Sequence, residues 1–257
     1  SDQVDYIEII RGTSGELDVR GSGQVVNVVL TEVFSDVSVQ YEVSGQQLED
    51  NVVAPNGSVS VSGTRGGLDY QVQGQIGENH GVTTYKESSI LGDFSPNDYI
   101  YRKDIDDREN FSLSGNLGYE INGSSSARFN AQYSEGTSRT DLNRKTTNLQ
   151  TLPVVDSYQR EDIRGEINNW EIGGDYEYNT ARGDRFKILL ISNSFTPERL
   201  RERWNLTGPY AESKNLFLDS ASTTRERIVR SSYTLDLFRG SQDIEFGAER
   251  AQTILDS

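Results

Sequence analysis

The side chains that could do chemistry in this sequence are few. The chain has one histidine, His80, and no cysteine. The histidine could ligate a metal or a haem, but it falls in a stretch that we interpret as a long loop, where a solvated side chain is the favoured interpretation. One histidine without cysteine forms neither a Ser/His/Asp nor a Cys/His catalytic arrangement. We therefore predict that the protein is not an enzyme and has no cofactor.

A short acidic run could bind a cation. Its members are Asp104, Asp106, Asp107 and Glu109. They could take Ca²⁺ or bridge the cations of lipopolysaccharide, but they lack the glycine and the terminal glutamate of an EF-hand loop. A solvated run of charges is the favoured interpretation, and we predict no metal site.

Composition narrows the function classes. The 257 residues carry a formal net charge of −15, which argues against a nucleic-acid partner because phosphate binding needs a cationic face. Only 33% of the residues are hydrophobic, which is poor for a globule that buries both faces of its sheets. No apolar run exceeds roughly six residues, whereas a transmembrane helix needs about twenty.

The first thirty residues predict a compact β unit that the rest of the chain follows. Two apolar runs rich in Val and Ile, at 4–10 and 24–30, flank a stretch with recurring glycines. Val, Ile and Tyr favour a pleated surface, and glycine permits backbone angles that other residues resist. This pattern predicts a strand, a glycine-rich turn and a second strand.

From about residue 36 the hydrophobic pattern has a period of two, as in Val37, Val39, Tyr41 and Val43. Similar alternating runs flank tight turns near residues 66, 123, 181 and 240, which are about 57 to 59 residues apart. Each unit is predicted to hold two strands of roughly ten residues, one short turn and a polar connection of roughly thirty residues.

Short turns at one end and long connections at the other are typical of a transmembrane β-barrel rather than of a soluble sandwich. The alternate positions of the strands carry polar residues such as Glu120, Glu171 and Asp175. These would be costly inside a dry sandwich but not against a hydrated lumen. We predict an all-β fold, a transmembrane antiparallel β-barrel.

Aromatic residues give a second argument for the barrel. Those close to the short turns are Tyr70, Tyr119, Tyr178 and Phe186, and those placed nearer the long connections are Tyr133, Trp170, Phe195 and Tyr233. Two bands of rings at opposite strand ends are what the two membrane interfaces select. The alternative is that these rings pack the core of a sandwich.

Once a barrel is predicted, the first thirty residues can be compared with the segment that precedes the barrel in a known family. Residues 7–12 read Ile-Glu-Ile-Ile-Arg-Gly, and residues 21–29 read Gly-Ser-Gly-Gln-Val-Val-Asn-Val-Val. This order resembles the end of the plug domain in TonB-dependent outer-membrane receptors. The residues that carry the resemblance are Arg11, Gly12, Gly15, Gly21, Gly23 and Asn27. Thr13 stands where proline is usual, which places the chain in a divergent branch.

The resemblance implies a barrel of 22 strands around a plug. We assign residues 1–34 to the C-terminal part of the plug and 35–257 to the N-terminal part of the barrel. About nine strands are counted, so we expect the chain to be part of a longer receptor. In resembling receptors an arginine at the position of Arg11 pairs with barrel glutamates and locks the plug. The alternative is that Arg11 caps a turn at the lumen surface.

The resemblance also implies a location and partners. It implies the outer membrane of a Gram-negative bacterium, with outer-membrane lipids, lipopolysaccharide and the TonB energy-transducing complex as partners. The receptor would take up a scarce ligand, such as a ferric siderophore, cobalamin or an oligosaccharide. The alternatives are a passive or structural barrel and, third, an extracellular β-sandwich binding module.

Overall fold

The computed structural model describes residues 4–11, 24–30, 37–48, 50–207, 211–237 and 242–256, the first two ranges by their backbone. All regular structure in these ranges is β-strand, arranged in two antiparallel sheets. None of the described residues forms a helix long and apolar enough to cross a membrane.

The opening residues form a two-stranded antiparallel sheet, as predicted. β1 (Val4–Arg11) pairs with β2 (Gln24–Leu30), so that Arg11 lies opposite Gln24 and Asn27 opposite Glu8. The glycines Gly12, Gly15, Gly21 and Gly23 lie outside the described residues, and so does the side chain of Arg11. The lock between Arg11 and barrel glutamates therefore stays a prediction.

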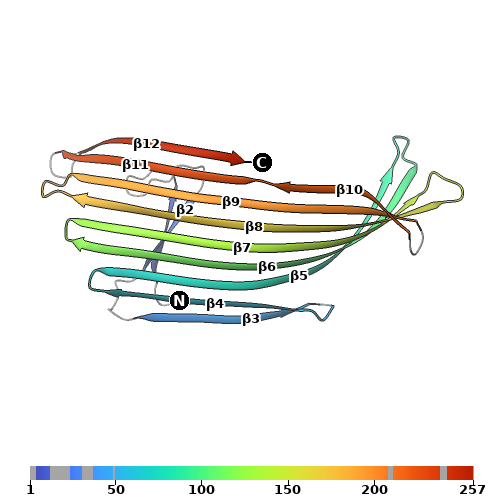
Figure 1. The fold of residues 1–257 in the computed structure, drawn as a ribbon, viewed down its shortest axis with the longest axis horizontal. Helices are drawn as coiled ribbons and strands as arrows, with labels where there is room; N and C mark the ends of the chain where they lie inside the picture. Colours follow the sequence, from blue (N-terminus) through green and yellow to red (C-terminus); the bar gives the residue numbers. More distant parts are fainter. Residues whose placement is uncertain are drawn as a thin grey trace.

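A single ten-stranded sheet contains the rest of the described chain (Figure 1). Its strands are β3 (Ser38–Gln47), β4 (Val53–Arg65), β5 (Leu68–Ile90), β6 (Pro96–Asn122), β7 (Ser125–Asn148), β8 (Val155–Asn179), β9 (Arg185–Leu206), β10 (Glu212–Ala221), β11 (Thr223–Leu237) and β12 (Gln242–Asp256). Strands that are neighbours in sequence pair antiparallel, with one exception. β10 and β11 do not pair with each other, because both pair with β9, at different positions along it. The edges β3 and β12 do not pair with each other, so this sheet is open.

The strands are much longer than predicted. β5 to β9 contain 22 to 27 residues each, rather than about ten. The predicted long polar connections are therefore wrong, because most of their residues continue the strands and only short links such as 91–95 and 149–154 remain. His80 lies in β5 and the acidic run lies in β6, rather than in loops.

The sheet has two chemically different faces near the short turns. One face, the apolar band, consists of alternate residues within 39–43, 59–61, 68–76, 111–121, 127–133, 170–178, 186–190, 229–235 and 244–248. The cross-strand register aligns these residues, so that Leu117 lies between Tyr70 and Phe129. The opposite, polar face aligns residues such as Ser114 and Gln132. The predicted period of two is confirmed for most strands near the short turns, but on β9 the polar face also carries Leu189 and Ile191.

No hydrophobic core lies between two layers of the described residues. Among them, Ala54 and Leu142 are the buried apolar side chains, whereas large ones in the apolar band, including Ile76 and Phe246, remain exposed. A sandwich of this size would bury many such side chains between its sheets. The apolar band is therefore uncovered in the described part of the protein.

The turn between β4 and β5 gives a first testable prediction. Gly66 and Gly67 have φ angles of +58° and +80°, as a two-residue type I′ hairpin requires. A Cβ on Gly67 would lie 3.0 Å from the backbone oxygen of Glu120, whereas one on Gly66 would meet nothing within 4 Å. We expect Gly66→Ala to cost about 1 kcal/mol and Gly67→Ala about 2 kcal/mol in urea unfolding. Equal midpoints for the two variants would contradict the predicted close contact.

Candidate functional site

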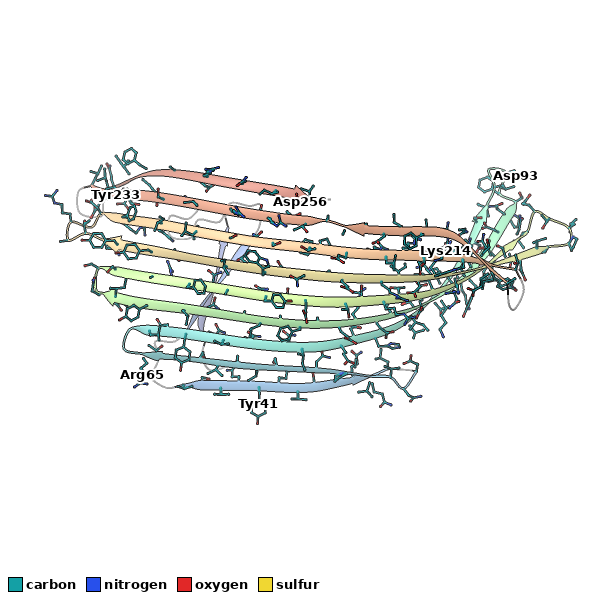
Figure 2. The ribbon with its side chains drawn as sticks, in the orientation of Figure 1. Tyr41, Arg65, Asp93, Lys214, Tyr233 and Asp256 are labelled. Carbon is teal, nitrogen blue, oxygen red and sulfur yellow. The ribbon has the colours of Figure 1, made fainter. Side chains whose placement is uncertain are left out.

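Aromatic side chains on the apolar band form rows across the strands. Tyr178, Phe186, Tyr233 and Phe246 are consecutive register partners on β8, β9, β11 and β12, beside the short turns. Tyr233 was predicted nearer the long connections, and this is wrong because its partner is Phe186. Figure 2 shows Tyr233 at the same end of the sheet as Arg65, far from Asp93 and Lys214.

A second group of rings lies near the other edge of the apolar band. Tyr133 is opposite Trp170, and its ring centroid is 6.3 Å from that of Phe111. The hydroxyl of Tyr133 donates a 2.8 Å hydrogen bond to Glu135 and accepts one from Asn168, so the ring has one apolar and one polar end. Phe195 was grouped with these rings, but the register places it on the polar face, since its neighbour Ser194 is the one opposite Trp170.

The height of the apolar band follows from its register. On β6 it runs from Phe111 to Ile121, which is about 34 Å along the strand and about 24 Å after a tilt of 45°. Beyond it, Glu78, Glu109, Thr137, Glu166 and Glu198 form one row across five strands. A groove of about 670 Å³ follows this boundary and is lined by both apolar and acidic side chains. The band therefore ends abruptly at a line of charge.

Beyond that line the strands continue as a polar extension, defined here as residues 78–90, 96–109, 137–148, 155–166, 197–206 and 212–221. Ion pairs join its strands. Arg160 on β8 binds Glu212 on β10 at 2.6 Å, and its guanidinium lies 3.8 Å from the ring centroid of Trp204 on β9. The hydrogen bond from Arg160 lowers the pKa of Glu212 below its ordinary value. Such cross-strand pairs can replace an apolar face in holding the sheet together.

His80 is held between two carboxylates in this extension. Its Nε2 lies 2.7 Å from Asp50 in the turn between β3 and β4, and its Nδ1 lies 2.5 Å from Asp107 on β6. Its side chain is only 10% exposed, so the prediction of a solvated loop histidine is wrong. Hydrogen bonds to Asp107, which has the larger effect, and to Asp50 raise the pKa of His80. The hydrogen bond from His80 in turn lowers the pKa of Asp50.

The three-residue contact predicts a pH dependence. A raised His80 pKa contributes stability that is complete below the ordinary value of 6.5 and is lost as the pH rises through the folded value. The lowered pKa of Asp50 contributes stability above 3.8 that is lost as the pH falls. We expect the turn formed by Leu48, Asn51 and Val52 to be held most firmly between about pH 4 and 6.5. Its amide protection factors in hydrogen exchange should fall between pH 6 and 9, and His80→Gln should remove this change.

Equal protection factors for this turn at pH 6 and pH 9 in the native protein would contradict the contact. The turn is a suitable reporter because Leu48 and Asn51 donate backbone hydrogen bonds within it, to Val52 and Leu48 respectively. Amides in β11, which pairs with neither β5 nor β6, provide the internal control.

The acidic run of β6 does not form one site. Asp104 and Asp106 lie on the polar face, where they accept from Arg102 and from the hydroxyl of Thr140, while Asp107 lies on the other face with His80. Asp104 is buried, so the interpretation as a solvated run is wrong for this residue. No group of three or more His, Asp or Glu in the described ranges is placed to hold a metal ion.

The sequence interpretation missed a buried carboxylate. The side chain of Glu161 on β8 is 1% exposed and lies 2.7 Å from Arg201 and 3.9 Å from Arg203, both on β9. The alternation of Arg199, Arg201 and Arg203 could have indicated that one face of a strand carries arginine. Glu161 itself gave no such signal, because charged residues flank it on both sides.

The described side chains place charge, aromatic rings and an uncovered apolar band at defined heights on one sheet. Comparison of the sequence with models of known protein families gave no match, and no curated protein matches it.

Proposed function

We propose that this chain forms part of the wall of a transmembrane β-barrel in the outer membrane of a Gram-negative bacterium. The observation that carries the proposal is the apolar band, which continues in register from β3 to β12 with no protein layer over it in the described part. A bilayer is the partner that fits an uncovered band that is about 24 Å high on β6, is lower on β9 to β12, and has rings near both edges. The polar face then lines the lumen.

We further propose that the barrel belongs to a TonB-dependent receptor. The hairpin of β1 and β2, with the sequence signature around Arg11, supports a plug segment that precedes the barrel wall. The receptor would capture a scarce ligand, such as a ferric siderophore, cobalamin or an oligosaccharide. Energy delivered through TonB would move the plug and let the ligand pass.

Uptake in whole cells tests this proposal. Cells that express the protein should accumulate one of three labelled probes: a ferric siderophore mixture, cobalamin or maltodextrin. Deletion of TonB should abolish that uptake. Uptake that continues unchanged without TonB would overturn the receptor assignment and favour a passive barrel.

A high single-channel conductance would favour the same alternative, because a plugged receptor should be nearly silent. Stable monomeric expression without detergent would favour an extracellular binding module, although the uncovered apolar band argues against it.

A further inference from the structure

The polar face of the extension concentrates arginine in a chain whose net charge is −15. The register places six arginines on this face, here called the arginine face: Arg102, Arg108, Arg144, Arg199, Arg201 and Arg203. The acidic residues on the same face of β5 to β9 are fewer: Glu87, Asp98, Asp104, Asp106 and Glu161. This face is therefore locally cationic.

Glu161 lies between two of these arginines. Its Oε2 accepts from Arg201 at 2.7 Å, and its Oε1 lies 3.9 Å from Arg203. The arginine side chains are 35% and 30% exposed, so each keeps N–H groups open to solvent. One carboxylate cannot neutralise two guanidinium groups. The hydrogen bonds from Arg201 to Glu161 and from Arg203 to Asn215 limit the side-chain entropy that a ligand must overcome.

Arg144 has a hydrogen-bond donor without an acceptor in the described structure. It lies opposite Arg102 on β6 and Gln159 on β8, and Arg102 is already bound by both oxygens of Asp104. The Nε of Arg144 is buried and has no hydrogen-bond partner within the described structure. An unpaired buried donor costs free energy, so a shift of the Arg144 side chain toward an anionic oxygen would gain a hydrogen bond.

Two residues with small or no side chains separate two further arginines on this face. Arg108 on β6 and Arg199 on β9 are exposed, and Ser138 and Gly165 lie between them in the same register row. Three strand spacings put their Cα atoms about 14 Å apart. Small side chains between two long cationic ones leave room for a ligand that reaches both.

From these contacts we propose that the arginine face binds a small soluble ligand with two or more carboxylate or phosphate groups. Guanidinium groups bind the oxygens of both groups through paired N–H donors, and a cationic surface in an acidic protein attracts anions selectively. This inference rests on the proposed function, because it makes the polyanion the class of cargo that the receptor takes from outside.

Calorimetric titration of the full chain in detergent tests the inference, with citrate and inorganic triphosphate as probes. Arg144→Gln and Arg203→Gln should each weaken binding of the better probe by about tenfold, which corresponds to the loss of one charge-assisted contact. Arg108→Gln should also weaken it, and this exposed residue has no ion pair in the described structure whose loss could unfold the protein. The matched control is Arg164→Gln, which makes the same charge change on the opposite face of β8 and should alter affinity by less than about twofold.

Three results would overturn the inference: no binding of either probe at millimolar concentration, an equal loss of affinity in Arg164→Gln and Arg203→Gln, or binding to vesicles containing lipopolysaccharide but to neither soluble probe. The last result would mean that the arginines contact lipid phosphates. The assay needs neither TonB nor a membrane. TonB-independent uptake together with intact probe binding would therefore overturn the receptor proposal alone.

Discussion

Leu117→Arg should prevent most of the protein from folding into lipid vesicles. Leu117 lies near the middle of the apolar band, between Tyr70 and Phe129. An arginine on the lipid face of a barrel costs about 2–4 kcal/mol at the bilayer midplane, which lowers the folding equilibrium roughly thirtyfold or more. The fraction of folded protein can be measured from its electrophoretic mobility before and after heating.

Asn116→Arg is the matched control for this experiment. Asn116 is the next residue on β6 and lies on the polar face, opposite Asn130. An arginine there would face water in the lumen and should change the folded fraction little. If Asn116→Arg were as harmful as Leu117→Arg, or more so, the assignment of the lipid-facing side would be wrong.

Arg201→Met should be the most destabilising change in the polar extension, at about 3 kcal/mol. It would leave the buried carboxylate of Glu161 with Arg203 at 3.9 Å as its nearest ion-pair partner. Removing one member of a buried pair costs more than the pair contributes, because the remaining charge stays unsolvated. Urea unfolding followed by tryptophan fluorescence can measure this, since Trp204 lies on the same strand.

Two further variants separate this effect from a general loss of charge. Arg108→Met removes an exposed arginine that has no ion pair in the described structure and should cost less than about 1 kcal/mol. The double variant Glu161→Gln with Arg201→Met should recover part of the lost stability, because the buried charge is then gone. A cost for Arg201→Met no greater than for Arg108→Met would contradict the burial of Glu161.

The strands of the apolar band could be predicted from the sequence because only one face there is apolar. Tyr119 and Phe129 alternate with polar residues, and this period has one interpretation. In the extension, Arg160, Asp162 and Arg164 lie on one face and charged or apolar residues lie on the other, so no period is visible. Their strands form through pairing with neighbours, which a local pattern cannot show.

Contacts between distant residues were also beyond the sequence pattern. His80 binds Asp50, 30 residues away, and Asp107, 27 residues away. Tyr233 was assigned to the wrong end of its strand because its height depends on where β11 pairs with β9. Register across strands is set by turns and by whole-sheet pairing, and a shift of a few residues changes which rings lie side by side.

In the proposed barrel, the short links at the end of the polar extension determine which parts of the protein are exposed at the cell surface. Residues 137–148 alone span about 40 Å at the rise of an extended strand, and the strand ends are joined by tight links such as residues 91–95. In a barrel of the proposed kind, an antibody or a phage would contact long paired strands joined by short turns rather than a layer of long loops. Surface recognition of this protein would then depend on its folded shape, and proteases added to intact cells would find few places to cut.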